Sequence, residues 1–164
     1  MSGHSKWSNI KYRKERVDSQ KSKIFSKLAK VIALAARSGS EANLNEAVEK
    51  AKQANMPKIN IERAIKKQEK SANLEEITYQ AIALFGVGLL IEAITDNKNR
   101  TLAEIKSILK KHNAQLGNVQ WMFETKDKPK YPLDLEPQQR AQLEKLFDEL
   151  DEQEDVHEIY SNLA

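Results

Sequence analysis

Apolar residues recur at the spacing of an α-helix through the first half of the chain. From Gln20 onward they fall within a sector of about 120° when the chain is wound at 100° per residue, which predicts a helix with one core-facing stripe. This stripe consists of Ile24, Phe25, Leu28, Val31, Ile32 and Ala35. Ser38–Ser40 should end the helix, because Gly39 can adopt the left-handed conformation common just past a helix C-terminus. Residues 1–17 lack the periodicity and are predicted to form an arm, with at most a short helix over Ile10–Arg16.

Two further helices are predicted after this one. The first of them carries apolar residues at i, i+3, i+4 and i+7, namely Leu44, Ala47, Val48 and Ala51. Pro57 breaks it, since the residue before a proline is disfavoured in the α conformation. The next helix begins after Pro57 and places Ile61, Ala64 and Ile65 on one face. Residues 20–68 are therefore predicted to be a three-helix unit, with a linker at Ser71–Asn73.

The hydrophobic period changes to 2 in the second half. Apolar and polar residues alternate over Ile77–Phe85, and Leu89–Thr95 is densely apolar. Gly86–Gly88 lies between these two runs, so they are predicted to form a hairpin. Thr101 and Glu104 fit a capping box that opens a helix. The inward residues of that helix are predicted to be Leu102, Ile105 and Leu109.

The remaining elements follow the same alternation of strand and helix patterns. Val119, Trp121 and Phe123 alternate as in a strand, and Tyr131–Leu135 is predicted as a short edge strand because it contains a proline. A helix begins at Pro137, and Val156–Tyr160 is predicted as the closing strand. The inward residues of this last helix are Leu143, Leu146, Phe147 and Leu150. The order β-β-α-β-(β)-α-β predicts an α+β fold, with an N-terminal three-helix domain followed by an α+β sandwich on a mainly antiparallel sheet.

Charge is distributed very unevenly along the chain. Residues 1–37 hold ten Lys or Arg against Glu15 and Asp18, a net charge of +8. Residues 1–72 hold 17 basic and 7 acidic residues, net +10, whereas residues 73–164 hold 10 basic and 17 acidic residues, net −7; together these give the +3 of the whole chain. We therefore predict two domains with different surfaces: a basic helical domain with an N-terminal arm over 1–72, and an acidic α+β domain over 73–164.

Composition argues against several classes of protein. The chain contains no cysteine, which excludes disulfides, thiolate catalysis and cysteine-based metal sites. No apolar run reaches the roughly 18–20 residues of a membrane span. We expect a cytoplasmic protein that needs no cofactor and has neither a membrane nor a small-molecule substrate as its partner.

Motifs for catalysis or metal binding are not found either. His4, His112 and His157 fall in three different elements, without the paired spacing of metal ligands. The acidic run Asp148–Asp155 lacks the spacing of a calcium-binding loop and is interpreted as a solvated helix end. Gly86–Gly88 lies between two strands, so it is a turn and not a phosphate-binding loop. We therefore expect neither an enzyme nor a metal site.

The basic N-terminal stretch is predicted to bind a polyanion. Trp7 and Tyr12 could stack on exposed bases, which suits single-stranded or looped RNA better than the groove of a duplex; alternatively, Trp7 packs the arm against the helical unit. The Asn97–Arg100 loop also has two interpretations, a helix cap or a second patch that recognises phosphate at a helix N-terminus. The candidate nucleic-acid-binding residues are Lys6, Trp7, Lys11, Tyr12, Arg13, Lys14, Arg16, Lys23, Lys27, Lys30, Asn97 and Arg100.

Several motifs, in their order along the chain, resemble those of the YebC family. Residues 1–14, MSGHSKWSNIKYRK, resemble its opening GHSKWxNIKxRK signature. Further matches are KIFSK at 23–27, NMPK at 55–58, IERAI at 61–65, TDNKNRT at 95–101 and WMFE at 121–124. The resemblance implies a non-enzymatic, cytoplasmic regulator of gene expression with a helical first domain and an α+β second domain. Members have been assigned as DNA-binding transcriptional regulators and as ribosome-associated translation factors, and mitochondrial relatives as translational activators.

Two segments depart from the pattern of that family. Ala81–Gly86 stands where members usually have a segment rich in glycine and proline. Members also typically insert a third domain after the strand that ends at Glu124, whereas here only Thr125–Lys130 separates that strand from Tyr131. The resemblance therefore implies a compact member that lacks the inserted domain.

Three partners are compatible with these features. Nothing resembles a recognition helix rich in Asn, Gln and Arg, so sequence-specific contacts in the major groove of DNA are poorly supported. The residues favour RNA, with ribosomal RNA or the ribosome as the partner. DNA is the alternative, and an acidic protein partner for the basic arm is the second alternative.

Overall fold

The computed structural model describes residues 10–67 and 73–164, with side chains from Ser22 onward. The chain divides into two compact units. One comprises Ile10–Glu75 together with Ile94–Asp96 and is called the helical unit below; the other comprises Glu76–Ala93 and Asn97–Ala164 and is called the sheet unit. The α+β fold class predicted from the sequence is confirmed, with helices first and a sheet domain after them.

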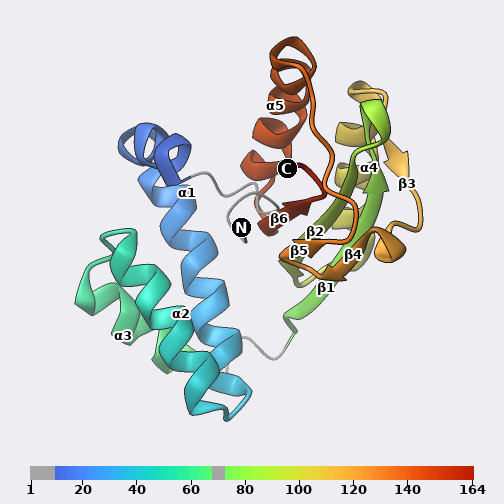
Figure 1. Ribbon diagram of the computed structural model, residues 1–164. Coiled ribbons are helices and arrows are strands. Elements are labelled where there is room, and N and C mark those ends of the chain that lie inside the picture. The colour runs from blue at the N-terminus through green and yellow to red at the C-terminus, as the bar shows by residue number, and fades with distance from the viewer. Residues whose placement is uncertain (1–9, 68–72) are drawn as a thin grey trace. The chain divides into compact units, whose positions relative to one another are not determined.

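The helical unit contains α1 (Ile10–Arg37), α2 (Glu41–Gln53) and α3 (Lys58–Lys66), and α1 packs against both of the others (Figure 1). Ser40 caps α2, because its side chain accepts a hydrogen bond from the backbone N–H of Asn43. Most of the core of the unit is built from the residues that the periodicity predicted, although Met56 was not among them and Ile24, which was, lies outside the cluster. Its buried members are Ile32, Ala47, Ala51, Met56, Ile61 and Ala64, with Phe25, Leu28, Val31 and Ala35 packed against them.

The predicted arm over residues 1–17 is corrected by the length of α1. A single helix runs without interruption from Ile10 to Arg37, where the sequence suggested at most a short separate helix over Ile10–Arg16. Lys and Arg, which supply four of the seven residues over Ile10–Arg16, have good intrinsic helix propensity, so a segment without apolar periodicity can extend an amphipathic helix. Residues 1–9 lie outside the described part of the chain.

The sheet unit is built on four strands in the order β3-β1-β2-β6: β3 (Gln115–Leu116), β1 (Glu75–Ile82), β2 (Gly88–Thr95) and β6 (Val156–Ser161). The β1–β3 and β2–β6 pairs are antiparallel. The 3-10 turn η3 (Leu84–Gly86) joins β1 to β2, and there Phe85 and Gly86 have φ values of 63° and 77°. The hairpin predicted around Gly86 is therefore present.

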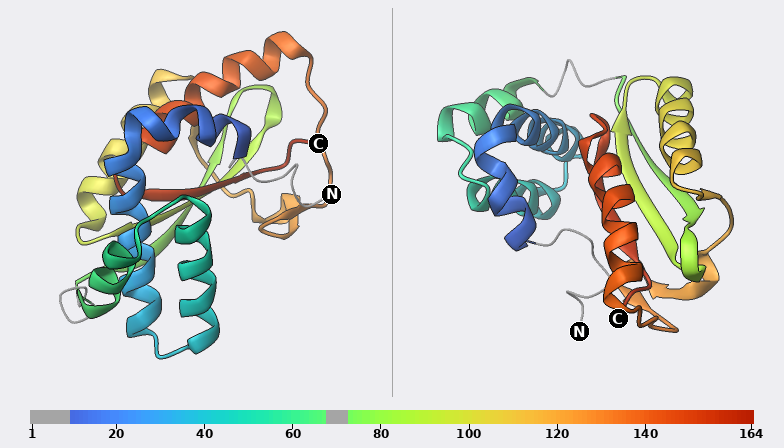
Figure 2. Two further views of the ribbon diagram at one scale, coloured as in Figure 1. Left: turned by 90° about the vertical axis from the view of Figure 1, so that its left-hand side faces the viewer. Right: turned by 90° about the horizontal axis from the view of Figure 1, so that it is seen from above.

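Two helices, α4 (Lys98–Lys111) and α5 (Pro137–Glu152), cover one face of this sheet, and Figure 2 shows them from two further sides. Leu89, Ile91 and Ala93 alternate along β2 and all enter the same buried cluster as residues of both helices. The helical members of that cluster are Ile105, Leu109, Leu143, Leu146, Phe147 and Leu150. The inward faces predicted from the sequence are thus correct, except that Leu102 is only half-buried and lies outside the cluster.

The opposite face of the sheet is covered in part by the 3-10 turn η4 (Gln120–Met122) and the hairpin of β4 (Phe123–Thr125) and β5 (Lys128–Pro129). A second cluster there joins Leu90, Val119, Met122, Phe123 and Tyr160. Gly88 permits this close packing. A Cβ at position 88 would lie 2.5 Å from Sδ of Met122 and 3.3 Å from Cβ of Val119.

Three details of the predicted sheet domain are wrong. Val119, Trp121 and Phe123 do not share a strand, because the η4 turn lies between Val119 and β4 and leaves Trp121 exposed. Tyr131–Leu135 is not a strand; Leu133 alone forms an isolated bridge, with Leu163. The helix predicted to open with a capping box at Thr101 begins one turn earlier and is capped by Asn97.

Candidate nucleic-acid interface

The basic side of α1 is the first feature of the candidate interface. Lys23, Lys27, Lys30 and Arg37 are spaced by 4, 3 and 7 residues, so they share one face of the helix. The opposite face carries Phe25, Leu28, Val31, Ile32 and Ala35, which pack into the core of the helical unit. The core therefore fixes which side of α1 presents its cations. Lys23 is exposed, and Arg37 donates from Nη2 to the carbonyl of Leu74 at 2.9 Å.

The other candidates near the N-terminus fall in two groups. Lys6 and Trp7 lie outside the described residues. Five more occupy positions in the first two turns of α1, where the backbone is helical: Lys11, Tyr12, Arg13, Lys14 and Arg16. Arg16 precedes Lys23 by seven residues, which is two turns of a helix. The possibility that Trp7 packs against the helical unit stays untested.

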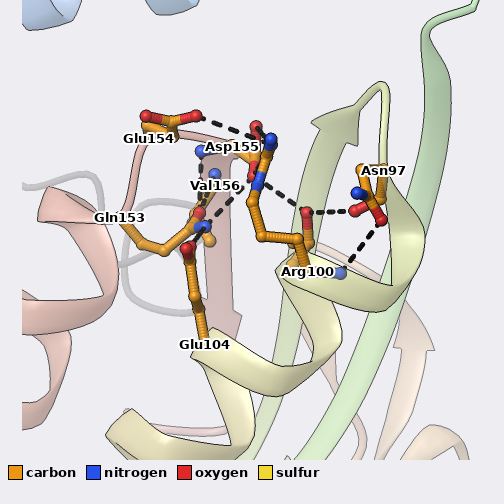
Figure 3. Close-up of polar contacts among 8 residues, drawn as sticks. Asn97, Arg100, Glu104, Gln153, Glu154, Asp155 and Val156 are labelled. Atoms are coloured by element: carbon orange, nitrogen blue, oxygen red, sulfur yellow. Dashed lines mark hydrogen bonds and ion pairs between the residues drawn. The ribbon is translucent and has the colours of Figure 1, made fainter.

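Asn97 and Arg100, the two candidates in the sheet unit, lie at the N-terminus of α4 (Figure 3). The Asn97 side chain accepts a hydrogen bond from the Arg100 backbone N–H at 3.1 Å, and the backbone carbonyl of Asn97 accepts one from the Thr101 hydroxyl at 3.1 Å. These are the contacts of a helix cap, which is one of the two functions the sequence suggested for this loop.

The Arg100 side chain is held by acidic partners. Its Nη2 donates to both carboxylate oxygens of Asp155, at 3.2 and 3.0 Å, and lies 3.5 Å from Glu154 (Figure 3). Asp155 is 2% exposed and also accepts from the Thr101 hydroxyl at 2.8 Å and from Gln153 at 3.1 Å. Because a buried carboxylate balances this guanidinium, its attraction for a phosphate is weaker than that of an exposed arginine.

Asp155 is a residue whose role the sequence did not reveal. The acidic run Asp148–Asp155 was expected to be a solvated helix end, but α5 stops at Glu152 and the chain then turns inward. Gln153, itself buried, holds that turn by accepting from the backbone N–H groups of Asp155 and Val156 at 2.7 and 2.9 Å. No periodicity marks such a turn, so nothing in the sequence distinguishes the buried Asp155 carboxylate from the exposed acidic residues beside it.

Both histidines among the described residues have carboxylate neighbours. His112 at the end of α4 lies 2.5 Å from Glu149 of α5, which Lys111 also contacts at 2.6 Å. The hydrogen bond from Lys111, followed by that from His112, holds the pKa of Glu149 below its ordinary value. His157 lies 3.8 Å from Glu76, and these two with Glu92 bring possible metal ligands within 4.8 Å of one another.

The group of His157, Glu76 and Glu92 was not anticipated from the sequence. Glu92 is buried, and its Oε1 already accepts from Lys126 at 2.9 Å. The ammonium lies 5.3 Å from the ring centroid of Tyr160. Although burial alone would lower the pKa of Lys126, the hydrogen bond and charge of Glu92 raise it above its ordinary value. The Lys126 ammonium thus already supplies the positive charge beside Glu92 that a metal ion would otherwise provide.

Two open hollows occur in the described part of the chain. One is lined by Thr78–Gln80 and 116–118, the other by Ile82–Leu84, Lys110 and 113–115. Neither combines a nucleophile with a general base or a cluster of acid and base groups.

Among the described helices, none has the length and hydropathy that crossing a membrane would need.

The fold and charge pattern define a class: a protein in which a basic three-helix unit precedes an α+β sheet unit. Comparison with known proteins is more specific. The profile of the TACO1/YebC protein N-terminal domain matches residues 5–71, and that of the TACO1/YebC second and third domain matches residues 74–128. The chain belongs to the TACO1/YebC family.

Similar proteins support the same assignment. A probable transcriptional regulatory protein of Thermoanaerobacter pseudethanolicus is 47% identical over 135 residues, which cover 76% of this chain and 55% of that protein. One from Borrelia hermsii is 47% identical over 149 residues, 84% of this chain and 61% of that protein. The chain thus spans between 55% and 61% of the length of these two relatives.

The fold is also that of a solved structure. The crystal structure of a conserved hypothetical protein from Aquifex aeolicus matches with a TM-score of 0.82 and 27% sequence identity, over 96% of this chain and 96% of that one.

Proposed function

We propose that this protein is a non-enzymatic, nucleic-acid-binding regulator of gene expression that acts in translation by binding RNA, with ribosomal RNA or the ribosome as its partner. The observation that carries the proposal is the basic face of α1. Cations stand on one side of a helix whose other side is buried, in a stretch of net charge +8 over residues 1–37.

Such a surface suits the backbone of a nucleic acid. Lysine and arginine neutralise phosphates and release condensed counterions, which makes affinity depend steeply on salt. Phosphate contacts fix position and carry no sequence information, so this face by itself would bind many sequences. The net charge of −7 over residues 73–164 would repel a polyanion, which favours the helical unit as the primary contact.

DNA is the second candidate target, and the names of the relatives favour it. Proteins nearly half identical to this one are named probable transcriptional regulatory proteins. Against it stands the composition of α2 and α3, in which a basic helix face with Asn, Gln and Arg placed for base edges is not evident. An acidic protein partner is a third candidate, because a cationic face binds acidic polypeptides by the same charge complementarity.

Crosslinking in living cells followed by sequencing of the attached nucleic acid tests the proposal. Enrichment of ribosomal RNA is the expected result. Discrete promoter fragments would instead establish the DNA alternative, and crosslinks that resist both RNase and DNase would establish a protein partner. A variant with Lys11, Arg13 and Lys14 replaced by alanine serves as the control, since it should lose the specific crosslinks.

A further inference from the structure

Trp121 and Tyr131 form an exposed aromatic pair in the sheet unit. Their side chains are 57% and 65% exposed, and their ring centroids lie 6.5 Å apart with an angle of 52° between the ring planes. The other large apolar side chains exposed among the described residues, Ile59 and Phe85, belong to different segments. Trp121 and Tyr131 are therefore an isolated ring pair and not part of a wide apolar surface.

The segment that carries Trp121 is held firmly in place. The backbone N–H groups of Val119 and Gln120 both donate to Oε1 of Gln80, at 2.9 and 3.0 Å. Val119 and Met122, on either side, are buried in the cluster that packs on the sheet. An exposed ring on an anchored turn loses little conformational freedom when it binds a partner.

The orientation of each ring leaves a face available. The indole N–H of Trp121 donates to the backbone carbonyl of Asn118 at 3.1 Å, so its only polar group is already satisfied within the turn. What the ring offers outward is its π surface. The 52° tilt shows that the two rings do not stack on each other. A flat partner can therefore lie against either ring.

The charges beside the rings distinguish between possible partners. Residues 125–131, TKDKPKY, hold three lysines and one aspartate in a unit that is otherwise acidic. Lys126 pairs with Glu92 and Lys128 with Glu124, while Lys130 is exposed and adjoins Tyr131 in sequence. The Lys130 backbone N–H donates to the Met122 carbonyl at 2.8 Å, which keeps this lysine close to the turn of Trp121. Aromatic faces next to a lysine suit a nucleobase with its phosphate better than they suit an apolar helix.

We propose that Trp121 and Tyr131 are a stacking platform for an unpaired base of a single-stranded nucleic acid. This inference rests on the proposed function and makes it more specific. Bases inside a duplex are already stacked on one another, so only a single-stranded or looped target can place a base on these rings. The sheet unit then contributes to binding through stacking, and the helical unit through phosphate contacts.

Fluorescence can observe the platform directly, because the chain has two tryptophans and Trp7→Phe leaves Trp121 as the only one. In this background, titration with a single-stranded oligonucleotide should quench Trp121 emission saturably. A strand of equal length made of abasic sites should bind, as measured by fluorescence anisotropy of a label on the strand, without quenching. Comparison of the base-containing strand with the abasic strand separates stacking from phosphate binding.

Two substitutions measure the energetic contribution. Trp121→Ala and Tyr131→Ala should each weaken binding of the base-containing strand by about 5- to 150-fold, with an unchanged salt slope, since no phosphate contact is removed. Trp121→Phe keeps a ring and should retain most of the affinity. Ile59→Ala, which truncates a side chain of the same 57% exposure, is the matched control and should bind like the parent protein. Circular dichroism checks that each variant is folded.

The outcomes that would overturn the platform are distinct from those that would overturn the proposed function. Binding of the base-containing strand without any change in Trp121 emission, or full affinity in Trp121→Ala, removes the platform and leaves the function standing. Self-association that Trp121→Ala abolishes would assign the rings to a second copy of the chain. Absence of binding of either strand to the parent protein at low salt removes the proposed function as well.

Discussion

The guanidinium of Arg100 donates to both carboxylate oxygens of Asp155 and so ties the first turn of α4 to the turn that precedes β6. Removal of one member of a buried ion pair leaves the other without compensation, which typically costs about 3–5 kcal/mol. We expect Asp155→Asn to lower the free energy of unfolding by an amount near the lower end of that range, since Arg100 is 37% exposed and water can solvate it in part. Urea denaturation measures the change.

Glu154→Gln is the matched control for that experiment. Glu154 also faces Arg100, at 3.5 Å, but its side chain is 68% exposed. Surface ion pairs contribute roughly 0–1 kcal/mol, so this variant should unfold almost like the parent protein. Equal destabilisation by the two substitutions would contradict a structural role for the buried Asp155 carboxylate.

The basic residues at the start of α1 should control the salt dependence of binding. Replacing Lys11, Arg13 and Lys14 with alanine removes up to three phosphate contacts. With a slope of about 0.7 per contact on a single strand, the plot of log K against log salt concentration should flatten by about 2. The control removes three exposed lysines from the sheet unit, Lys106, Lys110 and Lys145, and should leave the slope unchanged. An unaltered slope in the first variant would remove this part of α1 from the interface.

Gly88→Ala should destabilise the sheet unit by about 1–3 kcal/mol, the usual cost of overpacking. The new Cβ would lie 2.5 Å from Sδ of Met122, so that side chain must move out of its buried position. In a double-mutant cycle with Met122→Ala, the effect of Gly88→Ala should become smaller, because the clashing atom is gone. Additive effects would show that the close approach of Gly88 and Met122 is not the cause.

The contribution of Glu149 to stability should depend on pH. Its pKa is lowered in the folded protein by Lys111 and then by His112, so its carboxylate stabilises the fold above the unfolded-state value near 4.5. That contribution is lost as the pH falls below 4.5 and through the lower pKa of the folded state. Glu149→Gln should therefore be less stable than the parent at pH 7 and approach it in acid. Urea denaturation at several pH values, with Glu144→Gln as control, measures this.

Much of the fold followed from the sequence because buried positions repeat with the period of their element. Leu143, Leu146, Phe147 and Leu150 face the core as predicted, since an amphipathic helix gains its stability from one apolar face. The same rule failed between Val119 and Phe123. Alternation of apolar residues there looked like a strand, but two of the three are buried around a 3-10 turn and Trp121 points outward.

The candidate site was only partly accessible to sequence analysis. Periodicity identified the apolar side of α1, and therefore the face on which Lys23, Lys27 and Lys30 lie. It gave no sign that Arg100 would face Asp155, 55 residues further on, because that contact depends on how α5 ends and how the chain turns into β6. The sequence did not predict the exposed pair of Trp121 and Tyr131 for the same reason, since the contact between these rings depends on the tertiary fold.

The uninterrupted course of α1 has a geometric consequence for its target. At 1.5 Å per residue, the stretch of the helix from Lys23 to Arg37 extends about 21 Å. A flexible arm could follow any path of a backbone, whereas the cations on the helix from Lys23 to Arg37 keep fixed separations. Under the proposed function, the whole row from Lys23 to Arg37 would engage a nucleic acid only where the phosphates run nearly straight over about two nanometres, so the curvature of the target would influence where the protein binds.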